Sequence, residues 1–153
     1  MIDSDDTTAE YIFKYIGEND AVALERFLKQ NNSMIDVTQV KESRVYTALS
    51  FAAFKNHANC FKAIYQHAIT HNLAGGDVAF KAATSEVKKG ELTSLRRRQL
   101  ALWIDTPTDE RFTALHFATY HGNIELVRLM VEEMRANFLL KNVYGANVLH
   151  VAA

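Results

Sequence analysis

The apolar positions of this chain follow the same order in two separate stretches. TALSFAAFKNHANCFKAI begins at Thr47 and TALHFATYHGNIELVRLM begins at Thr113, and five of the first seven positions are identical. The offset is 113 − 47 = 66 residues, or twice 33. A third copy of the opening, NVLHVAA, begins 34 residues after the second, at Asn147. Self-similarity at a fixed period of this length is the signature of a repeat array.

Each copy predicts two short helices joined by a turn. In the second copy, Leu115, Ala118 and Thr119 lie at i, i+3 and i+4, which is one face of a helix. Gly122 with the asparagine that follows is a helix-stop signal, and the apolar residues of 124–130 form the face of a second helix. Alanines on the first helix of each copy allow neighbouring helices to approach closely, so the units can stack.

These periods divide residues 1–153 into one array without a domain boundary. We expect units at 42–72 and 108–141, a capping unit with a more polar outer face at 9–41, and a truncated unit at 142–153. Residues 73–107 would fill the remaining slot as a degenerate unit, with Ala82 and Ala83 as its alanine pair and Gly90 as its turn glycine. Extra residues before Gly90 predict a longer helix or a protruding loop.

The pattern resembles the ankyrin repeat. The Thr-Pro-Leu-His-like opening of that family is carried by TALH at 113–116, followed by Ala118, the turn glycine Gly122 and the leucine-rich stretch 126–130. The residues that match the next unit are Asn142, Gly145, Leu149, His150, Ala152 and Ala153. Alanine or valine replaces the family's proline, and Ser50 replaces its histidine in the earlier unit. The resemblance implies an all-α, ankyrin-type solenoid of stacked helix-turn-helix repeats, about four in number, with the last incomplete. The residues to which it assigns structural roles are Thr47, Leu49, Thr113, Leu115, His116, Gly122, Gly145, Leu149 and His150.

The amino-acid composition limits the cellular compartments and the classes of partner that fit this array. The 48% hydrophobic and 23% charged residues indicate a folded, soluble chain, and the net charge of −1 provides no field that would attract nucleic acid or an anionic membrane. A single cysteine, Cys60, excludes an internal disulfide and favours a reducing compartment. The acidic N-terminus does not resemble a signal peptide, and no apolar run is long enough to span a membrane. We therefore expect the cytoplasm, or the cytosolic face of a membrane protein, and an array that continues into further repeats beyond the uncovered apolar residues at its end.

The candidate chemical groups favour structural roles. By the resemblance, His116 and His150 hydrogen-bond backbone groups at the turn between repeats. His67 and His71 share a helix face but lack the glutamate of a zinc motif, so an ordinary solvated face is favoured over a metal site. The triplet at 96–98 is most simply a solvated basic face, and Cys60 is a small buried residue. With no nucleotide-binding or nucleophile motif, the prediction is a non-enzyme without cofactor, metal or nucleic-acid partner.

In the absence of such motifs, the exposed surface of the array is the remaining candidate site, and its residues predict binding to another protein. The resemblance places turn tips and the exposed side of the first helices on one concave face, where aromatic residues and arginine are typical interface anchors. An alternative is a regulatory or substrate-recruiting ankyrin region of a larger enzyme or membrane protein, such as an ankyrin-type palmitoyltransferase or a channel. The predicted concave-face residues are Arg44, Tyr46, Phe54, Lys55, Asp109, Glu110, Phe112, Tyr120, His121, Val143 and Tyr144.

Overall fold

The structure, a computed structural model, describes residues 4–31, 35–42, 46–73 and 86–147. Two short strands, β1 (Lys41–Glu42) and β2 (Tyr46–Thr47), pair in an antiparallel hairpin. Two π-helical turns, η1 (Ala68–Asn72) and η2 (Leu129–Glu133), follow α4 and α8. The helices are α1 (Ser4–Gly17), α2 (Ala21–Gln30), α3 (Ala48–Lys55), α4 (Ala58–His67), α6 (Glu86–Ile104), α7 (Ala114–Tyr120) and α8 (Ile124–Arg128).

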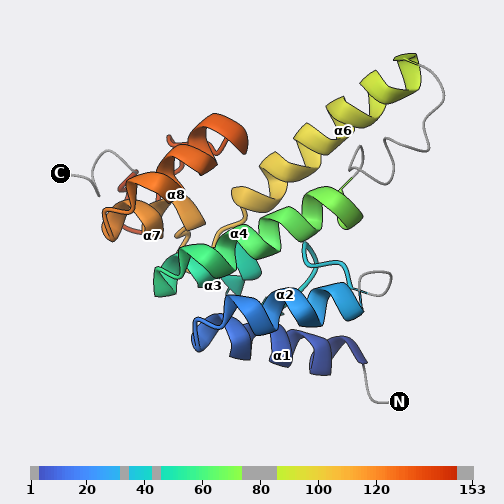
Figure 1. Cartoon of the computed structure of the whole chain (residues 1–153). Helices are drawn as coiled ribbons and strands as arrows, with labels where there is room; N and C mark the ends of the chain where they lie inside the picture. The colour runs from blue at the N-terminus through green and yellow to red at the C-terminus, as the bar shows by residue number, and fades with distance from the viewer. Residues whose placement is uncertain (1–3, 32–34, 43–45, 74–85, 148–153) are drawn as a thin grey trace.

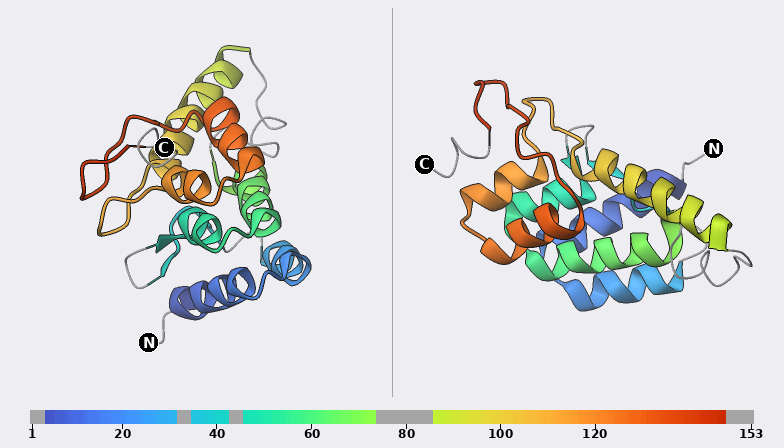
Figure 2. Two further views of the ribbon diagram at one scale, coloured as in Figure 1. Left: turned by 90° about the vertical axis from the view of Figure 1, so that its left-hand side faces the viewer. Right: turned by 90° about the horizontal axis from the view of Figure 1, so that it is seen from above.

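Three helix pairs stack in order. Within each pair the two helices pack on one another, as α1 on α2, α3 on α4 and α7 on α8 (Figure 1). Between the pairs, α1 packs on α3, α2 on α4, and α3 on α7. Figure 2 (left) shows the three layers from the side, with the connecting tips on one edge of the stack. The predicted all-α array of stacked helix-turn-helix units is therefore confirmed.

The two copies of the threonine motif begin their helices in the same way. The Thr47 hydroxyl accepts a bond from the backbone N–H of Ser50 at 3.0 Å, and the Ser50 hydroxyl accepts one from the N–H of Thr47 at 2.8 Å. Thr113 and His116 form the same reciprocal pair, with Nδ1 of His116 accepting from the N–H of Thr113 at 3.0 Å. Each pair satisfies two N–H groups at the start of a helix. Ser50 thus fills the cap role of the family's histidine.

The turns within the units also match, although different residues form them. Asn56 ends α3 with a φ of 59°, and Gly122, 66 residues later, has a φ of 67° after α7. Glycine adopts this left-handed conformation without steric cost, and asparagine adopts it more readily than most other residues. The repeat is therefore preserved at the level of backbone conformation where the residue type has changed.

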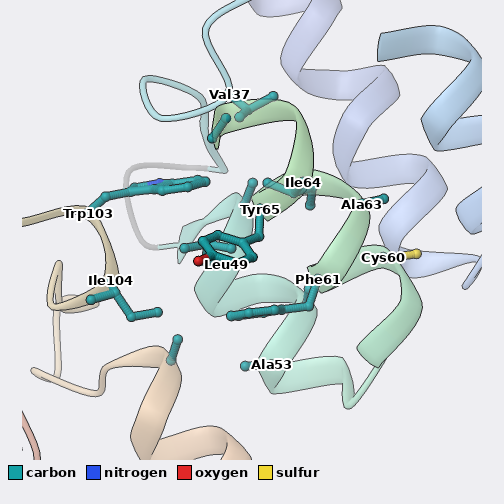
Figure 3. Packing of buried hydrophobic residues seen from close by; sticks show 14 of the residues in the cluster. Val37, Leu49, Ala53, Cys60, Phe61, Ala63, Ile64, Tyr65, Trp103 and Ile104 are labelled. Carbon is teal, nitrogen blue, oxygen red and sulfur yellow. The ribbon is translucent and has the colours of Figure 1, made fainter. Parts of the chain in front are cut away.

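Small residues on the first helices bring the layers together. Ala48, Ala52 and Ala53 on α3 and Ala114 and Ala118 on α7 are all fully or almost fully buried. Larger side chains from the second helices fill the space behind them, chiefly Phe61, Ile64, Leu126 and Met130. Figure 3 shows part of this core around α4, where Phe61 lies beside Ala53. Alanine contributes little area of its own, but it lets the larger apolar groups meet at close packing density.

The units at 42–72 and 108–141 are direct neighbours in space. α3 packs on α7, the Lys62 ammonium pairs with Glu125, and the Asn123 amide donates to Oδ1 of Asn56 at 2.9 Å. Residues 73–107, expected to fill a slot between them, contribute one described helix, α6, which runs along the outside of the stack (Figure 1). The chain leaves the array after η1 and returns to it before α7.

The expected turn at Gly90 is wrong, because Gly90 lies inside α6. Glycine costs a helix interior about 1 kcal/mol relative to alanine. The rest of this segment is rich in Glu, Lys, Leu, Arg, Gln and Ala, all strong helix formers, and their summed preference outweighs that cost. The expectation of a longer helix in this region agrees with the 19 residues of α6.

Among the described side chains of α6, the buried ones lie at its C-terminal end. Leu100, Trp103 and Ile104 are buried, and Figure 3 shows Trp103 and Ile104 directed toward the region of Leu49 and Tyr65. Leu95 and Leu102 are exposed. In Figure 2 (right) the N-terminal end of α6 extends past the stacked helices. The arginine triplet divides accordingly, since Arg96 is half-buried while the two arginines after it are exposed.

Some sequence-based expectations fall outside the described residues. These are the roles of Leu149 and His150, the alanine pair in the insertion, the contribution of Arg44 and the uncovered apolar end. The repeat boundaries, including the capping unit at 9–41 and the truncated unit at 142–153, stay predictions.

The anchoring of α6 predicts different effects for two neighbouring positions. Ile104→Ala should lower the free energy of unfolding by about 2–5 kcal/mol, because it leaves a cavity in a packed core. Leu102→Ala, two residues earlier on the exposed side, should change it by about 0.5 kcal/mol or less. Urea unfolding followed by circular dichroism measures both. Equal losses for the two variants would contradict the placement of α6.

Candidate functional site

The tips of the units lie on one edge of the stack and are fixed by backbone bonds. β1 and β2 form the first tip, with Glu42 opposite Tyr46. The second is closed by the N–H of Thr108, which donates to the carbonyl of Phe112 at 2.9 Å. The N–H of Val143 in the third tip donates to the carbonyl of Glu110 at 2.8 Å, joining the second and third tips. These bonds hold the side chains between the tips and the first helices in a defined arrangement.

A continuous row of aromatic rings crosses this side of the molecule. Phe13 of α1 contacts Phe51 of α3 with centroids 5.2 Å apart, and the Tyr46 ring lies 5.5 Å from Phe51 and 5.2 Å from Phe54. Phe54 reaches Phe117 of α7 at 5.3 Å. We call these rings, with the two described next, the aromatic row; its members are Phe13, Tyr46, Phe51, Phe54, Phe112, Phe117 and Tyr144.

The row continues from α7 into the third tip. Phe112 stacks on Phe117 with centroids 5.6 Å apart, and Tyr144 lies 6.4 Å from Phe112. The row therefore touches all three stacked layers. Its burial is graded: Phe13 is buried, the rings of Tyr46, Phe51, Phe112 and Phe117 are half-buried, and Phe54 and Tyr144 are 39% and 77% exposed. Stacked and edge-on ring contacts of this kind stabilise one another by about 0.5–1.5 kcal/mol per pair, which makes the row a pre-formed surface.

Charged groups of both signs border the aromatic row. The Lys55 ammonium lies 5.7 Å from the centroid of Phe51 and 5.5 Å from that of Phe54, a cation–π arrangement. Asp109 and Glu110 are exposed at the second tip. Partial burial raises the pKa of the Tyr46 phenol, and the carboxylates of Glu42 and Glu110 raise it further. The Tyr46 hydroxyl therefore stays protonated at neutral pH and can donate a hydrogen bond.

The structure brings only some of the predicted surface residues together. Tyr46, Phe54, Phe112 and Tyr144 belong to the aromatic row, with Lys55 over it. Asp109, Glu110 and Val143 are exposed at the tips. Tyr120 and His121 form a separate pair at the other end of α7, with ring centroids 5.4 Å apart. His121 also bonds the carbonyl of Phe54 near the end of α3.

Three members of the aromatic row were not among the predicted surface residues: Phe13, Phe51 and Phe117. Phe51 and Phe117 occupy the same position in the two copies, and the sequence analysis assigned them no role on the surface. A signal was available, because both are followed three residues later by a further aromatic, Phe54 and Tyr120. Two aromatics at i and i+3 on a short helix that carries buried alanine extend its apolar face beyond the contact between layers.

At the turn end of the stack, polar side chains join each layer to the next. Nε2 of His121 lies 2.8 Å from the carbonyl oxygen of Phe54, and Nδ1 of His57 lies 2.6 Å from that of Ile16. Each histidine thus bonds a helix-end carbonyl in the preceding layer. Carbonyls at the ends of helices lack partners within their own helix, and the bond from His121 satisfies the Phe54 carbonyl. The bond from His57 is a second one for the Ile16 carbonyl, which also accepts from the N–H of Asn19 at 3.0 Å.

His116 is placed for structure rather than for contact with a substrate. Its side chain is buried, with Nδ1 at the Thr113 cap and Nε2 3.2 Å from the carbonyl oxygen of Ala146 in the third tip. Burial lowers the pKa of His116, while bonds to the carbonyls of Ala146 and Leu140 act in the opposite direction. A neutral imidazole with both nitrogens hydrogen-bonded therefore connects the start of α7 to the third tip.

Other groups with reactive potential are covered or isolated. Cys60 is buried on α4 at the position that Leu126 occupies on α8, and burial together with Asp20 raises the pKa of its thiol to about 11. Across the described ranges, no three His, Cys, Asp or Glu side chains gather closely enough to hold a metal ion. The described helices also include none with the length and apolar character needed to cross a bilayer.

Comparison with known proteins agrees with this geometry. Residues 110–143, from the second tip through α7 and α8 to the third tip, match the ankyrin repeat family. Residues 110–143 are thus an ankyrin repeat. No curated protein sequence matches it. Among solved structures, a chain in the crystal structure of the yeast ribosomal protein Rps3 in complex with its chaperone Yar1 is similar, with a TM-score of 0.68 and 19% identity. That match covers 99% of this chain and 85% of the other.

Of the two copies, the matched repeat has more of the residues that are typical of the ankyrin motif. It contains the TALH opening, the Gly122 turn and Asn142, whereas the unit at 42–72 has Ser50 and Asn56 at the histidine and glycine positions. Both units nevertheless form the same cap and the same left-handed turn. The ankyrin geometry therefore extends beyond the residues that match the family in sequence.

Buried histidine predicts a stability that falls in mild acid. The folded-state pKa values of His116 and His67 are lowered from 6.5, chiefly by burial, so below pH 6.5 the unfolded chain binds protons that the folded chain resists. The unfolding temperature should thus decrease as pH falls from 6.5 toward 5. His116→Gln, which cannot take up the proton, should show a shallower decrease in differential scanning calorimetry across the same range. An unchanged pH dependence in this variant would contradict a buried neutral His116.

The thiol of Cys60 should be unreactive in the folded chain. With a pKa of about 11 it holds little thiolate at pH 8, and the buried sulfur is closed to reagents. We expect Ellman's reagent to modify it rapidly in guanidinium chloride and at least ~100-fold more slowly under native conditions, where unfolding limits access. Rapid native modification would show that α4 packs less tightly than the structure indicates.

Proposed function

We propose that this ankyrin-repeat chain is a binding module that recognises another protein through the aromatic row and the tips beside it. The observation that carries the proposal is the continuity of the row from Phe13 to Tyr144 across three layers. Seven rings in successive contact, of which Phe54 and Tyr144 are exposed and four others half-buried, form a pre-organised apolar surface, and binding to it requires little ordering.

The surroundings favour a protein partner over a nucleic acid. Aromatic residues lie at the centre, and charges of both signs lie at the edge, with Lys55 over the rings and Asp109 and Glu110 at the tip. An apolar centre with a polar rim is typical of protein interfaces. Protein surfaces that bind nucleic acid carry a clear excess of positive charge, whereas the net charge of this chain is −1. The yeast Rps3–Yar1 complex provides a precedent for a chain of similar fold within a protein–protein complex.

The proposal extends to the role and location of the chain. The rings and backbone bonds of the surface supply shape and apolar area, so the activity we propose is binding without catalysis. The edge charges would set orientation and association rate more than affinity. The single buried, unpaired thiol supports a reducing compartment such as the cytoplasm.

A capture experiment with matched variants tests the surface. Wild type, the double variant Phe54→Ala/Tyr144→Ala and the control Ile124→Ala would each be used to capture proteins from cell extract, with identification by mass spectrometry. Phe54 and Tyr144 are the most exposed members of the row, and Ile124 is 69% exposed on the second helix of its unit. Circular dichroism checks that all three fold.

We expect a specific protein to be retained by wild type and by Ile124→Ala and lost by the double variant. With the partner purified, each ring truncation at a central anchor should weaken binding by about 2 kcal/mol, or roughly 30-fold. A separate Tyr120→Ala variant then tests whether the interface extends to the turn end of α7. Full retention by the folded double variant would overturn the assignment of the aromatic row.

A further inference from the structure

Two helix faces were expected to be solvated, and the structure bears this out fully at only one of them. The expectation is wrong for His67 at the end of α4, whose side chain is only 8% exposed, although His71 is exposed. At the arginine triplet of α6, Arg97 and Arg98 are exposed. Neither of these two arginines forms an ion pair with a residue that the structure describes. Their guanidinium groups can therefore pair with a partner outside the stack.

α6 also has side chains at the spacing by which two helices pair. Leu92, Leu95, Gln99 and Leu102 are separated by three, four and three residues, and Thr106 follows four residues later, just beyond the helix. This spacing brings the side chains onto one stripe of a helix. Leu95 and Leu102 are 40% and 69% exposed, and the other two residues of the helix are half-buried. We call the four residues at 92, 95, 99 and 102 the α6 seam.

The α6 seam leads into a hollow at the C-terminal end of the helix. Gln99, Leu102 and Thr106 line a cavity of about 320 Å³, together with the loop before β1 and the end of η1. Two buried residues, Leu73 and Trp103, add apolar surface to its lining. Cavities of about 300 Å³ and more are typical of binding pockets. A helix that lies along the α6 seam thus places one of its own side chains over the hollow.

The charge beside the α6 seam is mainly positive. α6 has five Lys and Arg and two Glu, a net charge of 5 − 2 = +3. Arg98 lies three and four residues from the two exposed leucines and so borders the seam, and Lys41 borders the hollow. The carboxylate of Glu91 lies toward the N-terminal end of the seam, and Oδ1 of Asp36 at the hollow already accepts from the N–H of Thr38 at 3.0 Å. The part of the seam next to the hollow therefore favours acidic partner groups.

We propose that the α6 seam binds an acidic amphipathic helix of a partner protein, at a surface separate from the aromatic row. Apolar side chains of that helix would pack on Leu95 and Leu102, and a carboxylate beside them would pair with Arg98. Paired helices combine an apolar seam with opposite charges at its edges in this way. Because α6 runs along the outside of the stack (Figure 1), a second helix can approach it without disturbing the layers.

Other occupants of the α6 seam match its chemistry less well. A second copy of α6 would bring one basic helix against another, which is electrostatically unfavourable. Helices that lie in a bilayer surface place apolar and basic residues on opposite faces, whereas Arg98 shares a face with the exposed leucines. Binding to nucleic acid depends on phosphate contacts, to which leucine side chains contribute little.

Fluorescence anisotropy with a designed helix tests the proposal. The probe is a fluorescein-labelled, three-heptad peptide with Leu at every a and d position and Glu at every e and g position. The matched peptide has Lys in place of Glu, and like charges at e and g keep each peptide from pairing with itself. We expect the 153-residue chain to bind the Glu peptide at least ~10-fold more tightly than the Lys peptide. Equal binding of the two peptides, or binding of neither, would overturn the proposal.

The two adjacent exposed arginines provide matched variants. Arg98→Glu should weaken binding of the Glu peptide at least ~10-fold and shift the preference toward the Lys peptide. Arg97→Glu makes the same change in net charge on the side of the helix away from the seam, and should change binding by about 2-fold or less. Leu102→Ala, at an exposed position, should weaken binding at least ~10-fold while circular dichroism stays unchanged. Equal effects of the two arginine variants would indicate general charge attraction and contradict a docked helix.

Further measurements separate the other occupants. A dimer of the wild-type chain in sedimentation equilibrium that Leu102→Ala dissociates would assign the α6 seam to a second copy and overturn the proposal. Tighter binding to a duplex oligonucleotide or to phosphatidylserine vesicles than to the Glu peptide would do the same in favour of nucleic acid or membrane. The Phe54→Ala/Tyr144→Ala variant should bind the Glu peptide like wild type, so the result does not depend on the function proposed for the aromatic row.

Discussion

The contact between α3 and α7 is the constraint on which the rest of this structure depends. These short helices meet through alanines, and a larger side chain at any of those positions would separate the layers. Their close approach sets the distance between Phe54 and Phe117, the bond from His121 to the Phe54 carbonyl and the pairing of Asn56 with Asn123. Small residues at the seam thus determine the positions of large residues on the surface.

This seam also explains why the molecule has two faces of different character. At the tip end, the spacing between layers brings aromatic rings from successive units into contact, so that they form one surface. At the turn end, the same spacing lets histidine side chains bond helix-end carbonyls of the preceding layer and lets the Asn123 amide bond the Asn56 side chain. The first arrangement leaves apolar area partly exposed to solvent, whereas the second closes the array. A binding surface on one edge and a structural joint on the other follow from the same stacking geometry.

Much of the fold was readable from the sequence because caps and turns are local. Thr47 and Thr113 begin helices through bonds to residues three positions away, and the left-handed turns at Asn56 and Gly122 depend on a single residue each. The aromatic surface was predicted in part, since Tyr46, Phe112 and Tyr144 lie outside the helices, where no apolar periodicity assigns them to the core. Phe51 and Phe117 were missed because their half-burial depends on the layer next to them.

The environments of Gly90 and His67 could not be predicted from the local sequence, because they depend on contacts between segments far apart in the chain. A helix that leaves the stack is not bound by the repeat period, so the position of Gly90 within that period was not informative. The burial of His67 depends on α2 and on the segment around Ile35, which lie more than 30 residues away in sequence. Local pattern fixed the elements, and contacts between distant segments determined which side chains those elements cover.

The excursion of the chain through α6 has a consequence for how the array assembles. In a regular repeat array each unit packs on one roughly a single period away in sequence, and folding spreads from neighbour to neighbour. Here α3 and α7 are separated by two periods, because the chain leaves the stack after η1 and rejoins it before α7. Closing a loop of doubled length costs about 0.6 kcal/mol more in chain entropy. The joint between α3 and α7 therefore closes the longest loop of the joints between layers, and its tight packing has to offset that additional entropy.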